Sequence, residues 1–157
     1  MEEFKPKHTI SDSKKFQKGR ENLGKLILEG MKTTGGTDID WLIEHRGGFI
    51  LMENKEFYLD HIPIKKGQMI AFERLHEKLN SDGKCHFLFT GFDDIDYKNQ
   101  ESVIWYFEME DWKNGKIPSE YDTKYKTYQV NRKDMKPITL KEYRLLMEKF
   151  WKKFENS

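Results

Sequence analysis

Three segments of the chain repeat apolar residues at the spacing of an α-helix. The repeats predict helices over residues 14–31, 65–79 and 139–154. The last segment opens with Thr139 and Glu142, which are three residues apart, as a capping box requires. The residues that carry the first two repeats are Phe16, Leu23, Ile27 and Met31, followed by Met69, Phe72, Leu75 and Leu79.

Shorter apolar runs between these segments have the composition of β-strands. Residues 38–43 and 49–52 flank a link that contains Gly47 and Gly48, and glycine readily adopts the positive φ angles of a tight turn. We therefore predict an antiparallel hairpin, with positive φ at both glycines. The chain is expected to be α/β in class, with two further strands at residues 84–90 and 101–109.

The register of this hairpin brings acidic side chains together. With the turn centred on residues 46–47, Asp40 lies opposite Glu53, and Asp38 lies opposite Lys55. Directly opposed side chains have Cβ atoms roughly 5 Å apart. Two carboxylates at that separation repel each other unless positive charge lies between them. A divalent metal ion together with a lysine would supply that charge.

The faces of the first strand follow from its alternation. One face carries Asp38, Asp40 and Leu42, and the other carries Ile39, Trp41 and Ile43. A plainer interpretation is that the charges lie on the solvated face of an edge hairpin. The pattern acid, any residue, lysine also begins at Glu3, Asp12, Asp82, Asp96, Asp111, Asp122 and Asp134. What distinguishes Glu53 is the apolar run before it and the acids across the hairpin.

The order of features along the chain is an acid, a hairpin, Glu-x-Lys, and then a helix that opens with Gly67-Gln68. This order resembles that of the PD-(D/E)xK nuclease superfamily. The sequence segments GTDIDWLIE, FILMENK and GQMIAFERL are similar to those of small phage-type nuclease-like proteins. The resemblance covers residues 14–90, and Thr37 stands where the family pattern has proline. It implies a restriction-endonuclease-like core over about residues 14–110, with a mixed central sheet flanked by helices.

The resemblance also implies the roles of the site residues. Asp40 and Glu53, with the backbone carbonyl of Asn54, would hold Mg²⁺, or Mn²⁺ in its place. Lys55 would orient or deprotonate the attacking water and stabilise the charged transition state. Asp38 is a secondary candidate, which would orient Lys55 or cap the loop.

Further candidates lie on the two helices nearest the hairpin. Glu21 would complete the metal shell, with an ordinary exposed helical glutamate as the alternative. Gln68 would face the site from the first turn of its helix. Lys65 and Lys66 would bind a DNA phosphate at the start of that helix, with a solvated loop as the alternative.

Composition limits the class of protein. A chain of 157 residues can bury one core, which favours a single domain over residues 1–157. Cys85 is the lone cysteine, so an internal disulfide framework is excluded. No apolar run approaches the roughly 20 residues of a membrane span, and the N-terminus lacks the apolar centre of a signal peptide. We therefore expect a cytoplasmic protein with no membrane partner.

Charge and the remaining motifs are less informative. The formal net charge of +1 neither indicates nor excludes DNA, because a nuclease needs only a local basic face. The acidic residues Asp93, Asp94 and Asp96 lack the other positions of a calcium hand, so we interpret them as a solvated turn. Residues 121–136 interleave rings and cations, and we interpret them as a partly ordered surface loop, with nucleic-acid contact as the alternative.

The sequence therefore predicts a metal-dependent nuclease that hydrolyses DNA phosphodiesters. Its expected partner is DNA, and a homodimer is left open. One alternative is a catalytically silent nuclease-fold protein that binds DNA or another protein. The paired acids argue against it, because a silent descendant has no physical reason to keep an electrostatically costly pair. A nuclease acting on RNA would use the same site.

Overall fold

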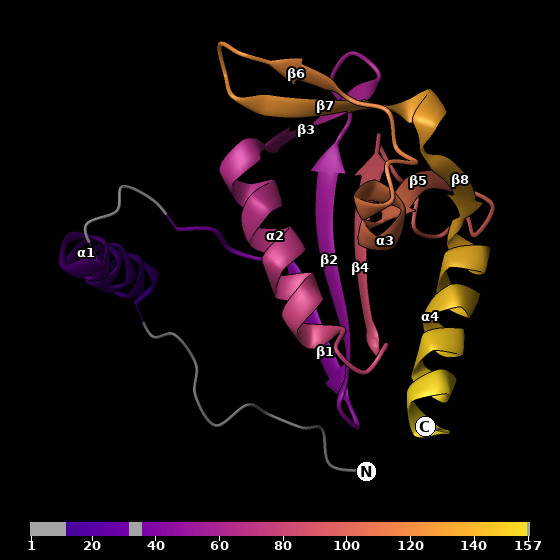
Figure 1. Cartoon of the computed structure of the whole chain (residues 1–157), viewed down its shortest axis with the longest axis horizontal. Coiled ribbons are helices and arrows are strands. Elements are labelled where there is room, and N and C mark those ends of the chain that lie inside the picture. The colour runs from indigo at the N-terminus through magenta and orange to yellow at the C-terminus, as the bar shows by residue number, and fades with distance from the viewer. Residues whose placement is uncertain (1–11, 32–35, 157) are drawn as a thin grey trace. The chain divides into compact units, whose positions relative to one another are not determined.

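A mixed five-stranded β-sheet forms the centre of the fold, in the strand order β1-β2-β4-β5-β8 (Figure 1). The computed structural model describes residues 12–31 and 36–156. Strands β2 and β4 are parallel, and the other neighbours in this sheet are antiparallel. The strands are β1 (Trp41–His45), β2 (Gly48–Glu56), β4 (Cys85–Phe92), β5 (Val103–Glu108) and β8 (Lys136–Thr139).

A second, antiparallel sheet joins β3 (His61–Lys65), β7 (Thr127–Asn131) and β6 (Glu120–Asp122). The interpretation of residues 121–136 as a partly ordered surface loop is therefore wrong. The segment instead contributes β7, the short helix η1 (Arg132–Asp134) and the ends of β6 and β8. It is ordered because Val130 is fully buried against the core, beside Ile62 and Ile64 of β3.

Helices cover both faces of the central sheet (Figure 1). On one face, α2 (Lys66–Leu79) and α3 (Met109–Lys113) pack with the second sheet around Leu51 and Phe89. On the other face, α4 (Leu140–Glu155) packs Phe150 and Phe154 against Ile50 and Leu88. The chain is thus α/β, as its apolar pattern predicts.

Most predicted elements are confirmed to within two residues. The three helices predicted from spacing match α1 (Ser13–Met31), α2 and α4, and the predicted strands at 84–90 and 101–109 match β4 and β5. Thr139 caps α4 through a reciprocal capping box with Glu142, as predicted. The two strands of the hairpin are the exceptions, because β1 begins at Trp41, after a bend at Asp40, rather than at Asp38, and β2 continues to Glu56, beyond the predicted run 49–52.

The turn of the hairpin differs from prediction in which residues have positive φ. These are Arg46 (φ 49°) and Gly47 (φ 81°), rather than Gly47 and Gly48. Gly48 is instead the first residue of β2, where a Cβ atom would lie 2.3 Å from Cγ of Phe154. The second glycine is therefore needed for the close approach of a ring and not for backbone conformation.

The chain divides into two units, Met1–Thr37 and Asp38–Ser157. The first contains α1, and the second contains both sheets and the remaining helices. The prediction of a single domain is not tested by this division and stays a prediction. Within the described ranges, no helix is both long enough and apolar enough to cross a membrane.

Candidate functional site

The hairpin register places Asp40 beside the end of β2. Trp41 pairs with Met52 and His45 pairs with Gly48, so the two-residue turn at 46–47 is confirmed. Asp40 comes directly before this ladder, and the same register continued by one residue places it across from Glu53. The Oδ2 atom of Asp40 accepts a hydrogen bond of 2.7 Å from the backbone N–H of Asn54. Asp40 is thus fixed next to Glu53 although it lies outside the regular strand.

The bend at Asp40 changes the predicted face of its neighbour. Ile39 packs against the cluster that contains Leu51, whereas Ile43 packs against the cluster that contains Ile50. The prediction that Ile39 and Ile43 share a face is therefore wrong. The reason is that strict alternation requires continuous strand geometry, which begins only at Trp41.

Glu53, Lys55 and Gln68 form one closed network between β2 and α2. Lys55 Nζ lies 3.2 Å from Glu53 Oε1, and Gln68 Nε2 donates to the same oxygen at 3.3 Å. Lys55 Nζ also donates to Gln68 Oε1 at 3.5 Å. Gln68 reaches the strand because it lies in the first turn of α2, directly after β3. The structure thus brings together three of the residues singled out from sequence.

The Glu53 side chain is buried, with 5% of the residue exposed. Burial raises the pKa of its carboxyl group, and the negative charge of Asp40 acts in the same direction. Lys55 and the backbone N–H of Asp40 oppose this rise in pKa but do not cancel it. Within the described part of the chain, buried Glu53 Oε2 has no donor in hydrogen-bonding geometry. The fold therefore holds an acidic oxygen whose negative charge is incompletely compensated.

Asn54 presents its backbone and its side chain to different neighbours. Its amide oxygen accepts a hydrogen bond from the hydroxyl of Thr90 on β4. Its backbone N–H points to Asp40, and in a strand the carbonyl of the same residue points to the same side. The carbonyl predicted to bind metal is therefore directed toward Asp40. Thr90, buried in an apolar strand, was missed by the sequence analysis, although a lone hydroxyl in such a run is a signal for a specific role.

The remaining candidates are Asp38, Glu21, Lys65 and Lys66. Asp38 is exposed and precedes the bend. Glu21 lies on α1 in the other unit, and its role stays a prediction. Lys65 and Lys66 are exposed at the start of α2, where Lys65 is the N-cap residue. The backbone N–H of Lys66 donates to the carbonyl of Lys126, so that this N–H is not available to a phosphate.

The donor set fits a hard divalent cation better than a transition metal. Among the described residues, no three or more His, Cys, Asp or Glu side chains are grouped so as to hold a metal ion. Mg²⁺ is commonly bound by only one or two carboxylates, with water and substrate oxygens completing its shell. Asp40 and Glu53 supply two carboxylates, and the unpartnered Oε2 of Glu53 is the atom that a cation would stabilise.

Comparison of the chain with protein-family models and with curated protein sequences finds no match. The functional assignment therefore depends on the site itself, on its acids, its lysine and the element order that positions them.

Proposed function

We propose that the chain is a metal-dependent nuclease that hydrolyses DNA phosphodiesters. The observation that carries this proposal is the buried Glu53 carboxylate, with one oxygen held by Lys55 and Gln68 and the other unpartnered beside Asp40. A fold does not keep such a group for stability, because an incompletely paired buried charge is costly. Groups of this kind cluster at functional sites.

The element order supports the same class. Along the chain, a helix is followed by the β1–β2 hairpin, by α2 and then by β4, which is parallel to β2. Glu-x-Lys lies at the end of β2, and Gln68 lies at the start of α2. This is the arrangement that the resemblance to the PD-(D/E)xK superfamily implies. We infer that the central sheet is the restriction-endonuclease-like core of that superfamily.

The chemistry assigned to each residue follows from its contacts. Asp40, Glu53 and the carbonyl of Asn54 would hold Mg²⁺, which when bound polarises the phosphate and the attacking water. Lys55 holds the water for in-line attack and offsets the negative charge that develops on the phosphate. Gln68 fixes both Glu53 and Lys55. The water oxygen loses a proton to solvent as it forms a bond to phosphorus, the bond to the leaving oxygen breaks, and the leaving oxygen takes a proton from solvent.

The test is cleavage of labelled linear, circular, single-stranded and branched DNA in Mg²⁺, Mn²⁺ or EDTA. We expect cleavage with either metal and none in EDTA. Lys55→Met removes the ammonium group but keeps most of the stem, so turnover should fall by a factor on the order of 10² or more. RNA of the same sequence tests whether the substrate is restricted to DNA.

The matched control is Glu56→Gln, because Glu56 lies on the same strand and is exposed. Prepared in parallel, it should cleave at the wild-type rate, whereas Glu53→Gln should not cleave. Equal activity of all preparations would indicate a contaminating nuclease. Metal-independent cleavage would overturn the mechanism, and no cleavage by the wild-type chain would favour the catalytically silent alternative.

A further inference from the structure

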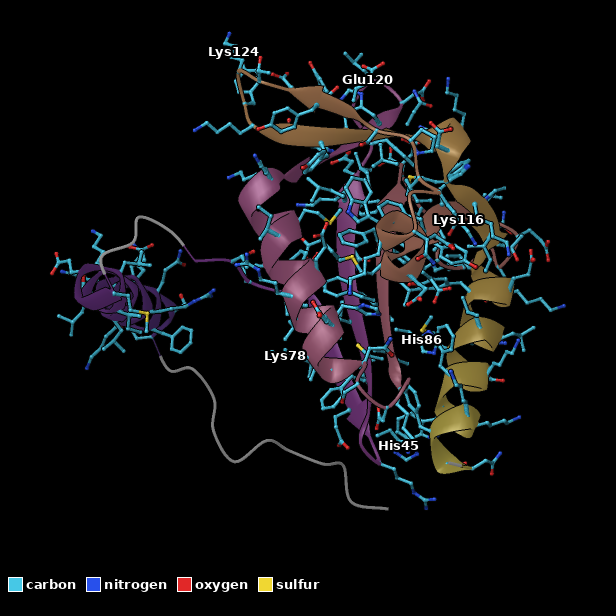
Figure 2. All side chains as sticks on the ribbon, in the orientation of Figure 1. His45, Lys78, His86, Lys116, Glu120 and Lys124 are labelled. Atoms are coloured by element: carbon cyan, nitrogen blue, oxygen red, sulfur yellow. The ribbon has the colours of Figure 1, made fainter. Side chains whose placement is uncertain are left out.

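The turn between β6 and β7 is fastened to the start of α2. Lys65 at the end of β3 pairs with Thr127 at the start of β7, and the Lys66 N–H donates to the Lys126 carbonyl at 2.9 Å. Figure 1 shows this turn extending past the N-terminal end of α2. In Figure 2, Lys124 lies at the tip of the hairpin, at the opposite end of α2 from Lys78.

The surface formed by this turn and the first turn of α2 is basic, and we call it the hairpin tip. Its four exposed lysines come from two segments far apart in sequence. The Oδ1 atom of Asp122, the last residue of β6, accepts hydrogen bonds from the backbone N–H groups of Lys124 at 2.9 Å and Tyr125 at 3.2 Å. The lysines are Lys65, Lys66, Lys124 and Lys126.

Aromatic rings lie between these cations. Tyr121 packs against Tyr128 with ring centroids 5.2 Å apart, and Tyr128 packs edge-on against Trp112, so that the ring of Tyr121 is supported from the core. Lys66 Nζ lies 5.7 Å from the centre of the Tyr121 ring. Tyr125 is 66% exposed, with Lys124 Nζ at 5.1 Å from its ring centre.

We propose that the hairpin tip, with Tyr121 and Tyr125, binds the nucleic acid strand that flanks the phosphodiester held at Glu53 and Lys55. Lysines interleaved with exposed rings suit a strand, because phosphates pair with the cations while unstacked bases lie on the rings. The proposal rests on the proposed function for the identity of the acidic site, but strand binding is measurable without cleavage.

The geometry of α2 indicates that this surface holds neighbouring phosphates and not the one that is cut. Lys66 and Gln68 are two residues apart, which is roughly 3 Å along the helix axis and about 200° around it. Because Gln68 points toward Glu53, the Lys66 side chain points away from the acidic site. A strand bound at the hairpin tip would therefore pass around the start of α2 before reaching Lys55.

The experiment measures binding of fluorescent single-stranded and duplex oligonucleotides by anisotropy, in EDTA and over a series of salt concentrations. The test variant is Lys66→Gln, Lys124→Gln and Lys126→Gln combined. We expect its affinity to fall at least tenfold, and the slope of log affinity against log salt to become shallower by about 2 to 3, since each lost phosphate contact contributes roughly 0.7 to 0.9. Tyr125→Ala should weaken single-strand binding at least fivefold, as expected for one lost stacking contact.

The control variant removes the same number of charges from the exposed face of α4, through Lys141→Gln, Lys149→Gln and Lys152→Gln. Its salt slope should equal that of the wild-type chain. Equal losses in the two variants, unchanged binding by the hairpin variant, or no oligonucleotide binding by the wild-type chain would overturn the proposal. Competition by polyglutamate as strong as by the oligonucleotide would also overturn it, because the surface would then bind any polyanion.

These outcomes are separable from those of the nuclease test. Loss of binding in the hairpin variant of a protein that never cleaves would support the strand-binding surface and contradict the nuclease. Cleavage by the wild-type chain together with unchanged oligonucleotide binding by the hairpin variant would support the nuclease and contradict the strand-binding surface.

Discussion

A carboxylate that is buried with one oxygen unpartnered destabilises the fold that holds it. For Glu53 this cost is visible in the raised pKa, because the folded chain keeps the proton to higher pH than the unfolded chain does. The contribution of Glu53 to stability is therefore most favourable when it is protonated at low pH. That contribution is lost as the pH rises from the ordinary value of 4.5 through the raised one.

We expect Glu53→Gln to raise the free energy of unfolding at pH 7, on the order of 1 kcal/mol. The difference between variant and wild type should shrink as the pH falls toward 4.5. Urea denaturation of both proteins between pH 4 and pH 8 measures it. For Glu56→Gln, which replaces an exposed acid, the difference should be small and flat over the same range. A variant less stable than the wild type at pH 7 would show that the ion pair with Lys55 outweighs the cost of burial.

At the scale of an element, the β1–β2 hairpin depends on two glycines for separate reasons. Gly47 provides backbone conformation, with a φ of 81°. Gly48 provides space, because the ring of Phe154 from α4 lies where its Cβ would be. A sequence pattern reveals glycines near a turn but not the distant ring that requires one of them.

Gly48→Ala should lower the free energy of unfolding by about 1–3 kcal/mol, as overpacking of a rigid buried ring does. Chemical denaturation measures the loss, and Gly48→Ala combined with Phe154→Leu should recover part of it. The control is Gly67→Ala in the first turn of α2, where a Cβ would meet nothing within 4 Å. That change should leave stability equal or slightly higher. Wild-type stability of Gly48→Ala would contradict the close approach of Phe154.

At the scale of the whole molecule, what could be predicted depends on the sequence distance between partners. The β1–β2 register follows from a local turn. Helix α4 could be predicted from the helical spacing of its apolar residues and from its capping box. The second sheet pairs β3 with β7, elements of five residues each and far apart in sequence, and no local signal joins them. Nucleic-acid contact is one interpretation of each segment of the hairpin tip from sequence alone, but the meeting of the two segments could not be predicted, since Lys66 and Lys126 come together only through that pairing.

The site could be predicted because its residues share one hairpin and the helix after it. The position of Asp40 follows from the turn, and the shared face of Glu53 and Lys55 follows from alternation along β2. The position of Gln68 was expected from the resemblance to the nuclease superfamily. The contact of Thr90 with Asn54 could not be predicted, because it requires the parallel pairing of β2 and β4 across α2.

Metal binding links this site to the stability of the whole molecule. An ion that binds only the folded chain raises the free energy of unfolding by mass action, by about 2.7 kcal/mol at a concentration 100 times its Kd. For a domain of this size, each kcal/mol shifts the melting temperature by roughly 2–4 °C. We therefore expect millimolar Mn²⁺ to raise the melting temperature of the wild-type chain by several degrees, and EDTA to reverse the rise.

The two neighbouring aspartates provide the matched pair for this measurement. Asp40→Asn should abolish the shift, because Asp40 lies across from Glu53 and is fixed there by the N–H of Asn54. Asp38→Asn should retain the shift, because Asp38 is exposed and precedes the bend that begins the site. The reverse result would reassign the metal to Asp38. Absence of any shift in the wild-type chain would instead favour a protein that binds its partner without metal chemistry.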